Sequence, residues 1–195
     1  GDLTHTYSGG AGTKSISISG TGINGFRFIG GGDKLKMLEV SNAGNLDITY
    51  DRSFTGCTNL TWTATDAPAI TTTSLNENFR ECTNFNGNID NWDVSNVTNM
   101  NLMFYAASSF NQPLNSWNTS NVEAMGNMFG YASSFNQPLN NWDVSSVTNI
   151  SDMFFSASSF NQPLNNWNTS NITNMFRVFR FSAFNQDISS WDINQ

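Results

Sequence analysis

The carboxylates of Asp93 and Asp143 are the first side chains in this sequence that could do chemistry. They occupy the same place in two copies of a repeated text, with one copy between them. If the copies form neighbouring strands, the two carboxyl groups are about 10 Å apart, just beyond the separations that glycosidases use. Nothing in the text around them would bury either acid and raise its pKa. We therefore expect no paired-acid catalysis.

Other catalytic or cofactor-binding signatures are missing from the sequence. His5 is the only histidine, so no Ser-His-Asp set can be formed. No G-x-x-x-x-G-K or Cys/His metal spacing occurs, and the Gly-rich text at 28–35 lacks the context of a phosphate site. We expect no enzyme activity, no catalytic residues and no cofactor. Calcium is the one ion considered, with Asp93 and Asp143 as its weak candidate ligands.

The two cysteines, Cys57 and Cys82, are 25 positions apart and fall at the same place in adjacent copies. Stacked backbones would bring them to about 5 Å from each other, where a disulfide is geometrically possible. Two small buried thiols in a core column are the interpretation that we prefer.

A repeat of 25 residues supplies the elements that must position these side chains. Each copy opens with a Phe and carries a Trp at a fixed place; the Phe positions are Phe85, Phe110, Phe135, Phe160 and Phe184, and the Trp positions are Trp92, Trp117, Trp142, Trp167 and Trp191. A period of this length suits one coil of a stack, because a single copy cannot bury its own apolar face. We predict an α/β repeat solenoid of about six coils over residues 29–195, with a β-rich N-terminal cap over residues 1–28, in one domain.

Within one copy, the spacing of apolar residues predicts a strand and then a helix. Trp92 and Val94 alternate with polar residues, which is typical of a strand with one buried face. From Val97 to Ala107, apolar residues recur at intervals that fit one face of a short α-helix, and Asn96 precedes them as an N-cap. This is the logic of a leucine-rich repeat, with a parallel sheet along the stack and one helix per coil behind it.

The residues between the buried strand positions form the candidate ligand-binding surface, which we call the polar strip. Its members are Asn91, Asp93, Ser95, Asn118, Ser120, Asn141, Asp143, Ser145, Asn166, Asn168 and Ser170. We expect it on the concave face of the sheet. Acid and amide alternate along its middle column, which keeps carboxylates on adjacent strands from repelling at about 4.8 Å. This alternation suits a solvated scaffold, and it also suits a recognition surface; both interpretations stay open.

The aromatic columns also have two interpretations. Exposed aromatic ladders stack on sugar rings, but these Trp residues occupy a core position of the coil pattern. We therefore predict the Trp and Phe columns as core. We expect Asn86 and its equivalents to stack as a column of amides that satisfies turn backbone.

The repeated text resembles a known family. FNQPLNNWDVSSVTNI at 135–150, followed by MFFSASSFNQ at 153–162, strongly resembles the BspA-like surface proteins with leucine-rich repeats, in the 25-residue variety known as DUF285 or the mycoplasma-lipoprotein-associated repeat. The resemblance covers residues 79–195 well and 29–78 loosely. It implies a secreted or surface-displayed bacterial or protist protein, in a family associated with adhesion, and it carries no catalytic residues.

The composition argues against nucleic acid as a partner and against insertion into a membrane. The net charge is −7, and Lys and Arg are absent from residue 81 through residue 176, so no basic stripe for nucleic acid exists. No apolar run of about 20 residues is present, so we expect no membrane insertion. We expect the sequence to be one module of a longer protein, extracellular or on the cell surface. The oligomeric state is left open.

Two functions fit these observations. The first is an adhesion or ligand-binding module whose partner is a host or neighbouring-cell surface protein or a glycan. The alternative is a rigid structural spacer that presents other domains, which the near-identity of the central copies favours. A flat surface that binds ice or another lattice is a minor third possibility.

Overall fold

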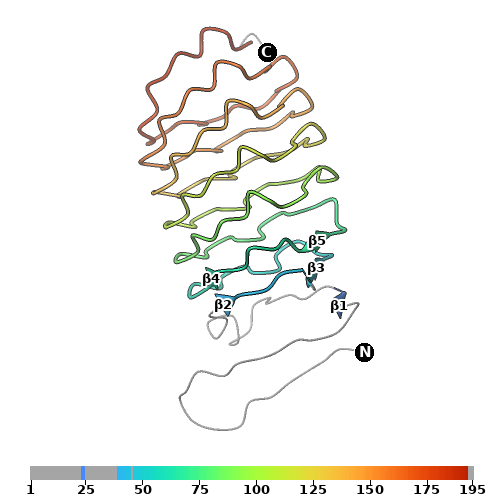
Figure 1. Cartoon of the computed structure of the whole chain (residues 1–195). Coiled ribbons are helices and arrows are strands. Elements are labelled where there is room, and N and C mark those ends of the chain that lie inside the picture. The colour runs from blue at the N-terminus through green and yellow to red at the C-terminus, as the bar shows by residue number, and fades with distance from the viewer. Residues whose placement is uncertain (1–22, 25–38, 45, 193–195) are drawn as a thin grey trace.

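The computed structural model describes residues 23–24, 39–44 and 46–192. In this part the chain forms a stack of coils that follow one another along a single axis (Figure 1). The predicted N-terminal cap, His5 and the Gly-rich text at 28–35 lie outside the described residues, apart from the two residues of the first strand. Within the described part no helix has the length and hydropathy that crossing a membrane requires.

Five short strands form the first coils. The strands β1 (Ile23–Asn24), β3 (Leu46–Ile48) and β5 (Ala69–Ile70) pair in parallel in that order, and β2 (Glu39–Val40) pairs in parallel with β4 (Thr61–Trp62). In register, Ile23 lies opposite Leu46, and Asp47 lies opposite Ala69. Beyond β5 the parallel ladder continues as single bridges that recur every 25 residues, at Ser74, Asn99, Ala124, Asn149 and Asn174.

The predicted α/β solenoid with one helix in each coil is wrong, because the described residues contain no α-helix. The stretches predicted as helices are instead runs of turns, which we call the turn segments: 51–56, 76–81, 101–106, 126–131, 151–156 and 176–181. Asn96 and its equivalents are therefore not helix N-caps. The strand predicted at Trp92 and Val94 is also absent, and the parallel bridges lie at Asn99 and its equivalents, inside the segment predicted to be helical.

The backbone hydrogen bonds explain why a turn segment is not a helix. The N–H groups of Glu77 and Phe79 donate across the stack to carbonyls of the next coil, on Asn101 and Met103, at 3.0 and 2.8 Å. The N–H group of Asn78, which lies between them, instead donates to the Leu75 carbonyl at 3.2 Å and closes a turn within its own coil. A helix would require every such group to bond four residues back along the same segment. Alternate donors instead join neighbouring coils.

Each turn segment contains two residues with positive φ, four positions apart. Glu77 and Glu81 have φ values of 57° and 61°, and Leu102 and Ala106 have values of 58° and 57°. Residues with positive φ at the third position of a four-residue turn are characteristic of type II turns. Asn, Ser and Thr are frequent here and compete with helical hydrogen bonding through their side chains. The apolar spacing that resembled a helix face is produced by turns.

Aromatic residues fill the core, as predicted. One row of stacked rings contains Phe54, Phe79, Phe104, Phe129, Phe154 and Phe179, and a second row contains Phe85, Phe110, Phe135, Phe160 and Phe184. Within a coil the two rows meet, with centroids 4.0 Å apart for Phe129 and Phe135. The Trp column is buried beside them, which rules out its use as an exposed carbohydrate platform.

Polar ladders connect the coils outside this core. The indole N–H of Trp142 donates to the Leu114 carbonyl at 3.0 Å, and Trp117, Trp167 and Trp191 make the equivalent bond. The side-chain oxygen of Asn111 accepts from the backbone N–H of Asn136 at 2.9 Å. The same bond links Asn86 to Asn111 and Asn136 to Asn161. The predicted column of amides that satisfies turn backbone is confirmed.

Candidate functional site

The polar strip is exposed, but its members are engaged in local turns. The side chain of Asp143 accepts hydrogen bonds from the backbone N–H and the hydroxyl of Ser145, at 2.9 and 2.6 Å. Asp93 holds Ser95 in the same way. Asn118 accepts from both groups of Ser120, at 3.2 and 2.8 Å. Aspartate and asparagine therefore have the same structural role, because the side-chain oxygen of each accepts a hydrogen bond from the residue two positions ahead and so closes a turn.

No sheet underlies the polar strip in the described residues, so its expected place on the concave face of a sheet is wrong, while binding of a ligand by the strip stays a prediction. Side chains next to the strip bond between coils instead: the amide of Asn121 donates to the Ser95 carbonyl at 2.7 Å, and Asn171 donates to the Ser145 carbonyl at 2.6 Å. Asn91 also reaches the preceding coil, where it donates to the Thr65 carbonyl. Much of the strip's hydrogen-bonding capacity is thus used to hold the stack together.

The acids of the strip are ordinary carboxylates that ionise easily. Hydrogen bonds from the Ser145 hydroxyl and backbone N–H lower the pKa of Asp143 below its usual value, and Ser95 lowers the pKa of Asp93 similarly. A general acid would need the opposite shift. Among the described residues no three His, Cys, Asp or Glu side chains come together as a metal site, and Asp93 and Asp143 sit in separate turns.

Cys57 and Cys82 are buried thiols that are not joined by a disulfide, which confirms the preferred interpretation. The Cys82 sulfur lies 3.0 Å from the Phe54 carbonyl, which it can reach as a weak donor. Burial raises the pKa of the Cys82 thiol far above its ordinary value, so the reactive thiolate does not form at neutral pH. The pair is part of the core.

A surface that the sequence analysis did not identify lies on the turn segments. We call it the aromatic ridge; its members are Tyr105, Tyr131, Phe155 and Phe181. Neighbouring rings meet edge to face, with centroids 5.3, 5.3 and 5.6 Å apart and planes tilted by 73°, 61° and 77°. Gly130 makes room for this arrangement, because a Cβ there would lie 3.1 Å from the Tyr105 ring.

The exposure of the ridge comes from its place on the turn segments and not from a missing neighbouring coil. Tyr131 has described coils on both sides and is still 45% exposed, and Phe181 is 66% exposed. Tyr105 and Phe155 are half-buried, and the other exposed large apolar side chains of the described part are Tyr50 and Phe176. The signal in the sequence was that these positions differ between copies whose Phe, Trp and Asn columns stay constant.

Arginines flank the ridge. The Arg80 guanidinium lies 5.5 Å from the Tyr105 ring centroid at one end, and the Arg180 guanidinium lies 4.8 Å from the Phe181 ring centroid at the other. Arg177 lies between two rings, 5.1 Å from Phe155 and 4.7 Å from Phe176. These distances are within the range of cation–π contacts. The ridge therefore combines apolar area with a guanidinium at each end, of which the one on Arg80 is paired with Glu77 and Glu81.

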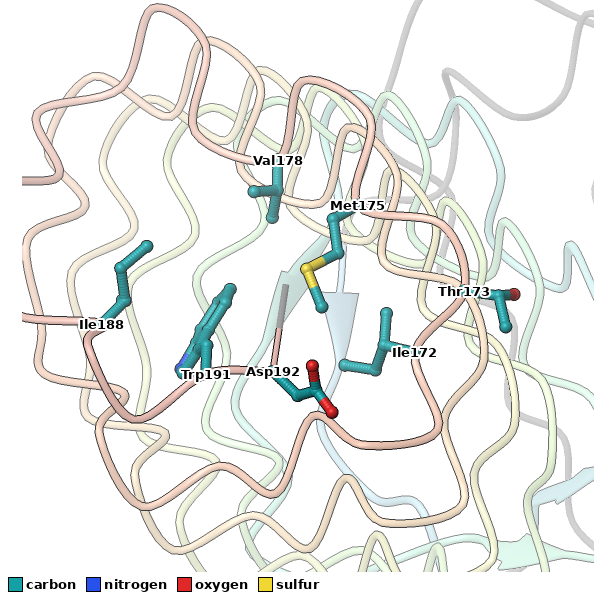
Figure 2. Close-up of a pocket in the computed structure, with 7 residues that line it drawn as sticks. All are labelled: Ile172, Thr173, Met175, Val178, Ile188, Trp191 and Asp192. Atoms are coloured by element: carbon teal, nitrogen blue, oxygen red, sulfur yellow. The ribbon is translucent and has the colours of Figure 1, made fainter. Parts of the chain in front are cut away.

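A hollow of about 300 Å³ opens at the last described coil. Figure 2 shows Met175, Val178 and Trp191 pointing into the coil, while Thr173 points away from it. These inward positions are the ones that the next coil covers elsewhere in the stack. The hollow is thus the face of the last described coil, on which nothing in the described part packs.

The fold and the ridge define a repeat protein built from stacked 25-residue coils. A family model described as "Mycoplasma protein of unknown function, DUF285" matches residues 49–149 and 123–195. The two matches together cover most of the chain, which belongs to the DUF285 family. No curated protein and no solved structure matches it. The family description gives no function.

Proposed function

We propose that this protein is a non-catalytic binding module that acts at a cell surface and contacts its partner through the aromatic ridge. The exposure of Tyr131 in the middle of the stack carries the proposal, because contiguous exposed apolar side chains rimmed by charge are typical of interaction sites. The location follows from the resemblance to surface proteins in the repeated text. Adhesion to a protein or glycan on a host or neighbouring cell is the role that we infer.

The pattern of variation between coils supports this role. Along one column of the turn face, residues 80, 105, 130, 155 and 180 are Arg, Tyr, Gly, Phe and Arg; along the next column, residues 81, 106, 131, 156 and 181 are Glu, Ala, Tyr, Ser and Phe. The Phe, Trp and Asn columns stay constant over the same coils. A constant scaffold with one varied face is the arrangement that repeat proteins use for recognition.

Backbone strain gives a second, independent support. Tyr131 and Phe181 have φ values of 59° and 62°, a region in which bulky residues are disfavoured and Gly or Asn are favoured. Every coil requires this conformation at the equivalent position, so the fold itself would be more stable with Gly or Asn there. Two exposed aromatic residues at such positions reduce stability without filling the core. Strained residues of this kind cluster at functional sites.

The spacer role remains the second candidate, and a specific observation favours it. The Trp and Asn ladders tie every coil to the next from residue 86 to residue 191. Such continuous bonding makes a stiff stack whether or not the surface binds anything. A binding module requires the aromatic ridge, whereas a spacer does not.

The test is binding to a panel of glycans, extracellular-matrix proteins and whole cells, with calcium and with a chelator. The parent is compared with the double variant Tyr131→Asn and Phe181→Asn. A control pair, Asn118→Ala and Asn168→Ala, changes the polar strip instead. We expect the ridge variant to lose binding and the control to keep it. Binding that only the strip variant loses would move the site to the strip, and no binding by the parent would favour the spacer.

A further inference from the structure

We propose that the C-terminal part of the ridge binds an acidic segment of a protein, with Arg180 pairing with a carboxylate. This rests on the proposed function and names the partner class for the same face. The contact surface consists of Phe155, Phe176, Arg177, Arg180 and Phe181. Phe176 is 62% exposed and Phe181 is 66% exposed, so both rings present most of their area outward.

The distribution of positive charge supports an acidic partner. All four arginines of the described part, at positions 52, 80, 177 and 180, lie in the turn segments, and this part contains no lysine. Arg52 and Arg80 pair with Glu77, and Arg177 pairs with Asp152 at 2.8 Å. Arg180 has no ion pair within the described residues. Its guanidinium therefore retains the capacity to bind a carboxylate with two parallel hydrogen bonds.

Arg177 is paired with Asp152, so it contributes to the contact surface through its position and not through an unpaired charge. Asp152 is buried, and its carboxylate fixes the Arg177 guanidinium between the Phe155 and Phe176 rings. The two rings and the guanidinium make a preformed surface that loses little side-chain freedom when a partner binds. Rigid aromatic residues beside arginine are the composition of hot spots in protein–protein interfaces.

The geometry of the rings favours a protein over a sugar. Successive rings of the ridge are tilted by 61° to 77°, so they do not form one flat platform. Stacking of consecutive sugar rings would need parallel faces along the ridge. Apolar side chains such as Phe or Leu can pack on the exposed edges and faces of these rings, and acidic residues beside them would reach Arg180.

The test measures binding of defined probes to the whole chain. One probe is a short soluble peptide that alternates Glu or Asp with Phe or Leu; its isostere has Gln and Asn in place of the acids. Heparin fragments and phosphatidylserine-containing vesicles represent anionic sugars and membranes. We expect the acidic peptide to bind at least about tenfold more tightly than the isostere, because charge-assisted hydrogen bonds are the stronger class. Added salt should weaken this binding.

Variants locate the contact. Arg180→Gln should weaken binding of the acidic peptide about tenfold. Arg52→Gln removes the same charge at the opposite end of the stack and should leave binding within about twofold, since only screened long-range attraction changes. Phe181→Asn should lose binding while the melting temperature stays at or above that of the parent, because Asn suits positive φ. A merely misfolded variant would instead show a lower melting temperature.

Several results would overturn this proposal. They are equal binding of the acidic peptide and its isostere, no binding of either, an effect of Arg52→Gln as large as that of Arg180→Gln, or preference for heparin or vesicles. The binding panel of the previous section separates these outcomes from failure of the proposed function. If the double ridge variant still abolishes binding there, the ridge remains a binding surface and only the acidic partner is wrong.

Discussion

At the scale of single residues, one side-chain oxygen closes a turn in each of four successive coils. Asp143 and Asn168 both accept from the backbone N–H of the serine two residues on, at 2.9 and 3.2 Å. The alternation of acid and amide that the sequence displays therefore requires no ligand. Carboxylates accept more strongly than amides, but placing one in every coil would bring like charges together. Alternating aspartate with asparagine keeps the stronger acceptor in every second coil and keeps the carboxylates apart.

This explanation predicts a pH-dependent effect of Asp143→Asn. Hydrogen bonds lower the pKa of Asp143 in the folded state, so its contribution to stability is complete above the ordinary aspartate pKa of about 3.9 and is lost as pH falls through the folded pKa. The asparagine keeps the acceptor and does not titrate. We expect the variant to be less stable at pH 7 by about 0.5 kcal/mol or less, because Asp143 is exposed.

Urea unfolding at pH 7 and at pH 3 measures this difference. The gap between parent and variant should close or reverse at the lower pH. A constant gap at both pH values would show that the carboxylate charge has no part in holding the turn.

The second residue-scale prediction concerns positive φ. Ala106 has a φ of 57°, and replacing it with glycine removes the steric penalty of the Cβ in that region. We expect Ala106→Gly to raise the free energy of unfolding by about 0.5–1 kcal/mol. Ala124→Gly is the matched control, because Ala124 lies on the parallel bridge without positive φ and its replacement should destabilise. Destabilisation by both variants would contradict the assignment of the turn conformation.

At the scale of elements, the sequence identified which residues are inside but not the backbone that carries them. Phe104 and Trp92 are buried as their columns predicted. The spacing from Val97 to Ala107 fits a helix face, yet two turns with positive φ present the same residues to the core. The spacing of apolar residues alone cannot distinguish a helix from such a pair of turns. The deciding interactions are hydrogen bonds between coils, which connect residues 24 positions apart and leave no local trace in composition.

The column of asparagines provides the element-scale prediction. The Asn136 side-chain oxygen accepts from the Asn161 backbone N–H at 2.9 Å and from the Gln162 amide at 3.1 Å. Asn136→Ala leaves both donors without that acceptor and should cost about 1–2 kcal/mol of unfolding free energy. Asn136→Asp keeps an acceptor in place and should cost less at neutral pH. Equal losses in chemical denaturation would show that the ladder is not what holds these coils together.

At the scale of the whole molecule, the position of the candidate site could be predicted from the sequence only in part. The polar strip was chosen because a strand was expected at Trp92 and Val94, and with no strand there it becomes a row of turns. The ridge was overlooked because its residues occupy a segment interpreted as a helix. The useful signal was copy-to-copy variation: Arg80, Tyr105, Gly130 and Phe155 share one column while the core text repeats.

A stack of this kind should distribute stability according to position along its axis. Each coil contacts only its neighbours, so a defect in the middle weakens two interfaces and a defect at an end weakens one. Phe129 is fully buried, and its ring centroid lies 5.5 Å from that of Phe104 and 5.7 Å from that of Phe154. Phe179 stacks on Phe154 at the same 5.7 Å but has no described coil on its other side. The two residues are thus a matched pair.

We expect Phe129→Ala to lower the free energy of unfolding by about 3–5 kcal/mol, the range for large-to-small changes that leave a cavity, and Phe179→Ala to cost clearly less. Urea denaturation gives the two totals. Hydrogen exchange shows where protection is lost: on both sides of the central coil for Phe129→Ala, and only beyond residue 150 for Phe179→Ala. Equal costs with uniform loss of protection would mean that the whole stack unfolds as one unit, and that coupling between coils exceeds the stability of any single coil.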